Sequence, residues 1–131
     1  MARDIARKGF DLDLRDGQMS ERAFGHVLWG PRTEIKRDEK AAQTENLFVE
    51  FMQPDGRGGM VPSGILVTTA DQWAFHVGGD LCWIVVPTPR LKELYEEARA
   101  KNKVAWGGDG KQYLGALVPK HWVTSRKPEP P

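Results

Sequence analysis

Alternating apolar and polar residues predict several strands along this chain. Residues 10–14 alternate between apolar and polar. Residues 32–38 and 46–52 are also predicted as strands, the first with Glu34, Lys36 and Asp38 on one face and the second with Leu47, Val49 and Phe51 on one face, because successive side chains of a strand point to opposite faces. A nearly continuous apolar run over 81–86 predicts a strand covered on both faces. A glycine-rich turn inside 104–123 predicts a hairpin, and a short extended piece is expected at 65–67.

Apolar residues at helical spacing predict three helices. The first covers residues 18–29. The second begins with a capping-box pattern, Thr69-Ala70-Asp71-Gln72, and stops at Gly78-Gly79. The third begins at Thr88-Pro89, and its predicted buried stripe is Leu91, Leu94, Tyr95 and Ala98. The order of elements predicts an α/β fold, a mixed β-sheet flanked by helices, in one domain over residues 1–123 with a disordered tail over 124–131.

Composition narrows the class of protein. The chain has 131 residues, one cysteine and a net charge of +1, so an internal disulfide and a cysteine-based zinc site are excluded. Cys82, Trp73 and Trp83 are expected to be buried, and Trp106 and Trp122 are candidates for exposure. Nothing resembles a signal peptide, and the longest apolar run is too short to span a bilayer. We therefore expect a cytosolic protein with no membrane partner.

The triplet Glu34-Ile35-Lys36 is the centre of the candidate chemistry. On a strand, its carboxylate and its ammonium project from the same face. A carboxylate there can hold Mg²⁺ or Mn²⁺, and a lysine can orient a water or offset phosphate charge. Because strands that are neighbours in sequence usually pair, Glu50 is expected on the same sheet face as Glu34. A solvated ion pair is the plain alternative for such a triplet.

Short motifs follow one another in a distinctive order between residues 10 and 90. They are Glu34, Lys36 and Asp38, then Thr44-Glu45-Asn46, Glu50, Pro62-Ser63-Gly64, Thr69-Ala70-Asp71 and Trp73. In this order they resemble small phage-encoded PD-(D/E)XK nucleases, although Glu45 stands where that family has glycine. The resemblance implies a restriction-endonuclease-like fold, metal-dependent cleavage of DNA, and a location in the cytoplasm of a bacterial host.

Two assignments of the site follow from the resemblance, which implies an acid on one strand and a Glu-x-Lys pair on the next. In the first, Glu34 is the leading acid and Glu50 is the acid of the second strand. Met52 then occupies the usual position of the lysine, and Lys36 on the first strand takes over its role. In the second, Glu34 and Lys36 form the pair and Asp13 is the leading acid. We prefer the first, because no strand separates the first helix from Glu34.

Further residues complete the prediction. By resemblance, Glu21 on the first helix supports a second metal ion or its waters. Asp38, about 13 Å along the strand from Glu34, is a peripheral candidate. Side chains expected to contact DNA phosphates are Arg32, Arg37, Lys40 and Arg57.

The resemblance also favours a class of substrate. Branched DNA such as a junction is the leading substrate, with duplex DNA remaining open, and a junction cutter needs two sites and hence a homodimer. The alternatives are a non-catalytic phage accessory module that binds nucleic acid or protein, and a metal-free RNA-binding fold.

Overall fold

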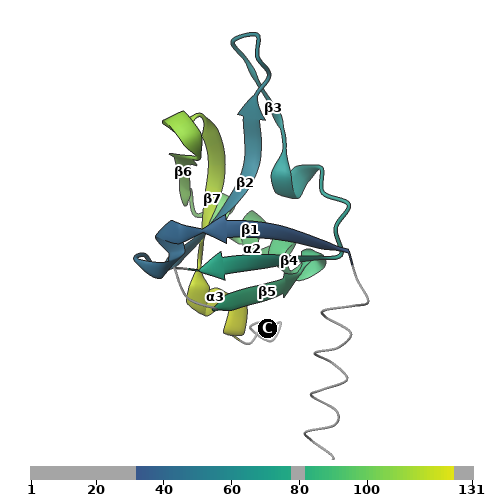
Figure 1. Cartoon of the computed structure of the whole chain (residues 1–131), viewed down its shortest axis with the longest axis vertical. Coiled ribbons are helices and arrows are strands. Elements are labelled where there is room, and N and C mark those ends of the chain that lie inside the picture. Colours follow the sequence, from purple (N-terminus) through teal and green to yellow (C-terminus); the bar gives the residue numbers. More distant parts are fainter. Residues whose placement is uncertain (1–31, 78–81, 126–131) are drawn as a thin grey trace, which may run out of the picture. The chain divides into compact units, whose positions relative to one another are not determined.

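Two β-sheets form the framework of the computed structural model, which describes residues 32–77 and 82–125 (Figure 1). The first sheet has the strand order β1 (Thr33–Asp38), β4 (Gln72–Val77), β5 (Trp83–Pro87). The second has the order β3 (Met60–Pro62), β2 (Asn46–Pro54), β7 (Tyr113–Pro119), β6 (Val104–Gly107). The described residues are thus mixed α/β, as expected, but they contain two sheets where the sequence predicted one.

Helices are few in the described part of the chain. The longest is α2 (Thr88–Ala100), and α3 (Lys120–Thr124) is a short one near the end. Single 3₁₀ turns are η1 (Glu39–Ala42), η2 (Gly64–Leu66) and η3 (Asp109–Lys111). None of the helices described is long and apolar enough to cross a membrane. The strand predicted at 10–14 and the helix predicted at 18–29 lie outside the described residues.

The prediction of a helix over residues 70–77 is wrong. Residues 72–77 form β4, which pairs in parallel with β1 and antiparallel with β5. Trp73, Phe75 and Val77 share one face of this central strand, an alternation that competes with the helical spacing in the same segment. Pairing with β1 on one side and β5 on the other stabilises this segment as a strand and not as a helix. The piece at 65–67 is likewise not extended, because it largely forms η2.

The predicted pairing of the strands at 32–38 and 46–52 is also wrong. Both strands exist, but β1 pairs with β4, whereas β2 lies between β3 and β7. In Figure 1 the strands of the first sheet run across the direction of β2. Glu34 and Glu50 therefore belong to different sheets, and no shared sheet face brings them together.

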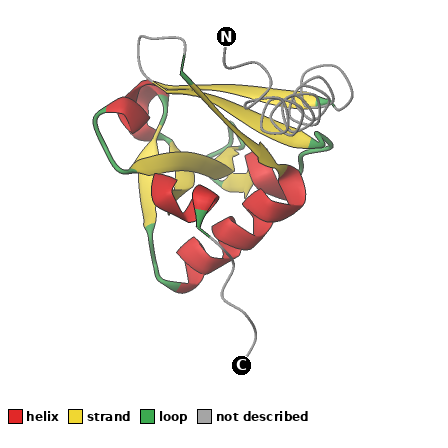
Figure 2. Cartoon of the chain, turned by 90° about the horizontal axis from the view of Figure 1, so that it is seen from below, coloured by secondary structure: helices red, strands yellow, loops and turns green. Residues whose placement is uncertain are grey.

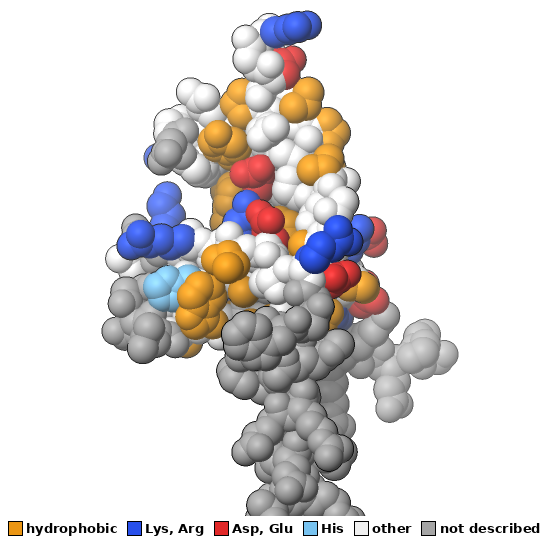
Figure 3. All heavy atoms as spheres, turned by 45° about the vertical axis from the view of Figure 1, so that its right-hand side comes forward, with side chains coloured by type: hydrophobic (Ala, Val, Ile, Leu, Met, Phe, Trp, Pro, Cys, Tyr) orange, Lys and Arg blue, Asp and Glu red, His pale blue; other side chains and the backbone are white. Residues whose placement is uncertain are grey.

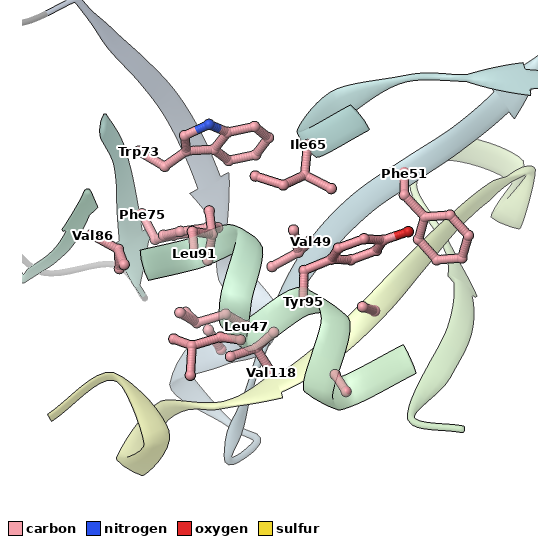
Figure 4. Packing of buried hydrophobic residues seen from close by; sticks show 14 residues of the cluster. Leu47, Val49, Phe51, Ile65, Trp73, Phe75, Val86, Leu91, Tyr95 and Val118 are labelled. Carbon is pink, nitrogen blue, oxygen red and sulfur yellow. The ribbon is translucent and has the colours of Figure 1, made fainter. Parts of the chain in front are cut away.

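A single apolar core joins the two sheets and α2. Figure 4 shows Leu47 and Val49 of β2 facing Phe75 of β4 and Leu91 of α2. The predicted stripe of α2 is confirmed, since Leu91, Leu94, Tyr95 and Ala98 are all buried. The helix, seen as the longest red coil in Figure 2, begins at Thr88 with a proline in its first turn, as predicted.

The outer strand β5 differs from its prediction. Trp83 is 46% exposed and Val85 is 37% exposed, so one face of this strand is open. Cys82 is exposed as well, which corrects the expectation of a buried thiol. Alternation holds within β5, where Val86 is buried between exposed neighbours. The strand therefore behaves as a sheet edge with one covered face.

The C-terminal hairpin matches its prediction. Strands β6 and β7 pair antiparallel around η3, and Trp106 is 55% exposed. Trp122, on α3, packs partly buried against the core. Helix α3 reaches Thr124, the first residue of the predicted tail, and residues 126–131 lie outside the described residues.

Candidate functional site

A cleft of about 520 Å³ brings Glu34, Lys36 and Glu50 together. It is lined from β1, from β2, from the segment 63–70 and from β4. Its other lining residues are Arg32, Thr33, Gln53, Ser63, Gly64, Val67, Thr68, Thr69, Ala70 and Trp73. On the face shown in Figure 3, acidic and basic side chains meet near the middle of the described surface. The three residues that the sequence ranked first thus share one concave surface.

Strand β1 supplies the charged pair of the cleft. Glu34 and Lys36 lie on the same face of this edge strand, and the Lys36 Nζ lies 3.2 Å from the Glu34 Oε1. The same ammonium lies 5.4 Å from the ring centre of Trp73, which stands opposite Glu34 on β4. The side chains are 43% exposed for Glu34 and 34% for Lys36. The pair is therefore held in place but remains accessible to a ligand.

Glu50 reaches the cleft from an irregular part of β2. Between Glu50 and Met52, two residues of β2 advance against one of β7, as in a β-bulge. Such irregularities redirect side chains, and Glu50 lies on the face of β2 opposite to the buried Val49 and Phe51. It is half-buried, in keeping with a carboxylate at the wall of a cleft.

The motif Pro62-Ser63-Gly64 fixes the backbone beside Glu50. The backbone N–H of Ser63 donates to the carbonyl of Phe51 at 2.9 Å. Gly64 has a left-handed φ of 53°, and a Cβ there would overlap the carbonyl group of Glu50. Only glycine therefore permits this close approach, which explains the motif in structural terms.

Asp71 anchors the start of β1 and does not cap a helix. Its carboxylate accepts the backbone N–H of Arg32 at 2.9 Å, and its own backbone N–H donates to the Arg32 carbonyl at 2.9 Å. The guanidinium of Arg32 lies 4.0 Å from the same carboxylate, and its side chain is 73% exposed. Arg32 thus stands at the cleft as an accessible cation, the position expected for a phosphate contact.

Asp38 has a structural role in this arrangement. One carboxylate oxygen accepts the N–H of Ala41 at 3.1 Å and the other accepts the N–H of Phe48 at 2.9 Å. These bonds cap η1 and tie the end of β1 to β2. Asp38 does not line the cleft that contains Glu34, so its candidacy as a peripheral metal ligand is not supported.

The other predicted residues are not in the cleft. Arg37 lies on the opposite face of β1 from Glu34, and Lys40 lies in η1. Arg57 lies in the exposed β2–β3 turn, and it does not line the cleft. Asp13 and Glu21 lie outside the described residues.

The β2–β3 turn is organised by one carboxylate. Asp55 accepts the backbone N–H of Arg57 at 2.6 Å and that of Gly59 at 3.0 Å. These bonds, that from Arg57 first, lower the pKa of the Asp55 carboxyl below its ordinary value, because they stabilise its charged form. These bonds close the turn of a hairpin, because β2 and β3 pair antiparallel on either side of it.

The donor set of the cleft is compatible with a hard divalent cation. Mg²⁺ is commonly held by one or two carboxylates, with waters and substrate phosphates completing its shell. Glu34 and Glu50 supply two carboxylates in one cleft. Within residues 32–77 and 82–125, no group of three or more acidic, histidine or cysteine side chains is placed to hold a metal ion. Glu34 and Glu50 are thus the carboxylates that the described cleft could offer to a hard divalent cation.

Comparison with protein-family models, with curated proteins and with solved structures gives no match for this chain. The likeness to PD-(D/E)XK nucleases thus rests on the order of short motifs in the sequence. The convergence of Glu34, Lys36 and Glu50 is an independent observation, because it comes from the fold.

Proposed function

We propose that this protein is a divalent-metal-dependent nuclease that hydrolyses phosphodiester bonds of DNA in the described cleft. The observation that carries the proposal is the convergence of Glu34, Lys36 and Glu50, which come from two different sheets, on one concave surface. Two carboxylates with an adjacent ammonium form the set of groups that metal-assisted phosphodiester hydrolysis requires.

The two carboxylates would hold Mg²⁺ or Mn²⁺. When bound, such an ion polarises the phosphate and lowers the pKa of a coordinated water. Glu50 is positioned for this by the irregularity in β2 and by Gly64, which packs on its backbone. Glu34 is positioned by the pairing of β1 with β4. Both carboxylates are therefore carried by hydrogen-bonded strands, Glu34 by β1 and Glu50 by β2.

Lys36 would act on the phosphate or on the attacking water. Its Nζ lies 3.2 Å from the Glu34 Oε1 and 5.4 Å from the centre of the Trp73 ring, and Lys36 lines the cleft. A fixed positive group offsets the negative charge that builds up on the phosphate oxygens during attack. Arg32, which is largely exposed at the same cleft, would contact the DNA backbone.

The substrate of the proposed nuclease is branched or duplex DNA. Branched DNA is favoured by the resemblance to small phage nucleases. Cleavage of a junction on two strands would need two copies of the cleft, and therefore a homodimer in a bacterial host cell. The described cleft itself is compatible with a single phosphodiester strand on each protomer.

The decisive experiment is cleavage of labelled duplex, single-stranded, flap and four-way-junction DNA with Mg²⁺, Mn²⁺ or EDTA. We expect cleavage that requires metal and that falls on the order of 100-fold or more in Glu34→Gln. Glu97→Gln is the matched control, because Glu97 also forms a half-exposed ion pair, with Lys101 at 3.1 Å, on α2. A folded Glu34→Gln protein that cuts as fast as Glu97→Gln would contradict the proposal.

A non-catalytic module that binds nucleic acid is the second candidate. It is favoured by Met52, which holds the second-strand position where the resemblance implies a lysine. Such a module would bind DNA equally well with Mg²⁺ and with EDTA and would cut none of the four substrates. Salt-dependent binding of RNA in place of DNA would instead favour an RNA-binding protein.

A further inference from the structure

Two buried polar atoms in the cleft have no hydrogen-bond partner. They are the Ser63 Oγ and the Trp73 Nε1, and no other buried side-chain nitrogen or oxygen of the described residues lacks one. Ser63 is 4% exposed and Trp73 is 1% exposed. An unpaired buried donor costs about 1–3 kcal/mol, and folded proteins leave few of them. Both of these residues line the same cleft, which indicates that one cause accounts for both unpaired atoms.

Both donors are held on rigid parts of the fold. Trp73 stands on the central strand β4, directly opposite Glu34. In Figure 4 its indole nitrogen lies on the edge of the ring turned away from Phe75 and Leu91. Ser63 is fixed by its backbone bond to Phe51, next to Gly64.

The chemistry of the donors defines the ligand. An indole N–H can only donate, so its partner must be an acceptor atom. The cations of the cleft each have an acidic neighbour, Lys36 with Glu34 at 3.2 Å and Arg32 with Asp71 at 4.0 Å. The Ser63 hydroxyl and the Trp73 N–H differ from these cations because they carry no charge. The carboxylates of the cleft therefore cannot form ion pairs with them. These neutral donors are therefore suited to hold an anionic oxygen beside acidic side chains.

We propose that the Ser63 hydroxyl and the Trp73 indole N–H donate hydrogen bonds to non-bridging phosphate oxygens of the nucleic acid bound in this cleft. The inference rests on the proposed function for its choice of ligand. It assigns two binding residues beyond the charged triplet of Glu34, Lys36 and Glu50. It also explains why the segment Pro62-Ser63-Gly64 approaches β2 so closely, since that approach carries the hydroxyl to the cleft.

The first test separates binding from stability in the full chain. In Ser63→Ala the unpaired hydroxyl is removed, so we expect an unfolding temperature that is unchanged or higher. The affinity for a short labelled DNA duplex, measured in Ca²⁺ and again in EDTA, is expected to fall about tenfold. Ser125→Ala is the matched control, because that hydroxyl is bound to the His121 carbonyl outside the cleft.

The second test observes the indole directly. In an NMR titration with the same duplex, the side-chain N–H resonance of Trp73, assigned with Trp73→Phe, is expected to shift with the bound fraction. The resonances of Trp83 and Trp106, which are exposed outside the cleft, are expected to stay in place. These residues are internal controls in one spectrum.

The outcomes distinguish this inference from the proposed nuclease. If Ser63→Ala weakens binding and the Trp73 resonance shifts while no DNA is cut, the donors hold phosphate in a binding module. If DNA is cut but Ser63→Ala binds like Ser125→Ala and the Trp73 resonance does not move, the inference is overturned and the nuclease stands. Absence of duplex binding in both Ca²⁺ and EDTA overturns it as well.

Discussion

The cleft and the apolar core are built from the same strands, but their side chains differ in burial and in hydrogen bonding. In β2, Val49 is fully buried in the core, whereas the next residue, Glu50, lines the cleft. In β4, Phe75 and Trp73 are both buried in the core, but Trp73 also lines the cleft and its N–H has no partner. The residues that line the cleft thus differ from the rest of the core, because they include half-exposed charges and unpaired polar atoms.

This difference separates residues that maintain the fold from the residues to which we assign binding in the proposal. Burial of a leucine or phenylalanine stabilises the fold by about 1.5–3 kcal/mol, so the core gains from every side chain in it. The cleft instead contains half-exposed charges and two donors that lower stability. Substitutions in the two regions should therefore have opposite signatures in stability and in binding.

The largest effect on stability is expected in the core. Leu91→Ala removes a fully buried side chain from α2 and is expected to lower the free energy of unfolding by about 2–5 kcal/mol. Denaturation in urea measures this change, and Lys92→Ala, at the exposed neighbouring position, should alter it by less than about 0.5 kcal/mol. Equal stability of the two variants would mean that the core is not packed as described.

A second large effect is expected where the cleft meets the fold. Gly64→Ala introduces a side chain at a left-handed φ against the Glu50 carbonyl and is expected to cost about 2–4 kcal/mol. It should also weaken DNA binding, because both Ser63 and Glu50 must move. Gly58→Ala provides the comparison, since its φ is 87° but nothing lies within 4 Å of the added Cβ. A Gly64→Ala protein no less stable than Gly58→Ala would rule out the close approach.

A smaller effect distinguishes two acids on one face of β1. Asp38→Ala leaves the N–H groups of Ala41 and Phe48 without their acceptor and is expected to lower stability by about 1–3 kcal/mol. Glu34→Gln breaks only a half-exposed ion pair, so its effect on stability should stay below about 1 kcal/mol. Thermal unfolding of both variants measures the contrast, and the reverse order of stabilities would exchange the roles given to these residues.

The smallest effect is a local one that depends on pH. The folded pKa of Asp55 is lowered, so its bonds to Arg57 and Gly59 stabilise the turn above the ordinary carboxyl pKa and are lost as the pH falls through the folded pKa. We expect the amide resonances of Arg57 and Gly59 to shift in that acid range, and Asp55→Asn to remove the transition. Unchanged resonances through the titration would show that the carboxylate does not organise the turn.

The strands with a regular period of two were predictable from sequence. Both β1 and β2 follow their alternation, and the spacing of Glu34 and Lys36 sufficed to place them on one face. For β4, helical and alternating patterns coexist in the same six residues, so the local sequence could not decide. The decision came from its pairing with β1, a contact between segments far apart in the chain.

Of the residues predicted for the site, Arg32, Glu34, Lys36 and Glu50 line the cleft, but the way in which the fold brings them there was not predictable. Glu50 was expected beside Glu34 through direct strand pairing, yet the two meet through a cleft between different sheets. The motif Pro62-Ser63-Gly64 contributes to the sequence resemblance, but the sequence does not show that the Ser63 hydroxyl is buried. The structure shows that it is buried and has no hydrogen-bond partner. The meeting of two sheets at a cleft and the unpaired state of a buried hydroxyl depend on residues far apart in the chain. The periodicity of the local sequence does not contain this information.

The parallel pairing of β1 with β4 has a consequence for when the cleft can form during synthesis of the chain. The hydrogen bonds from Arg32 to Asp71 and from Gln72 to Thr33 each span 39 residues of sequence. A growing chain that ends before β4 already contains Glu34, Lys36 and Glu50, but β1 has no strand to pair with. Closing so long a loop is entropically costly and is a slow type of folding step. Assembly of the cleft is therefore coupled to completion of the fold, and partly synthesised chains would carry the charged residues without the site.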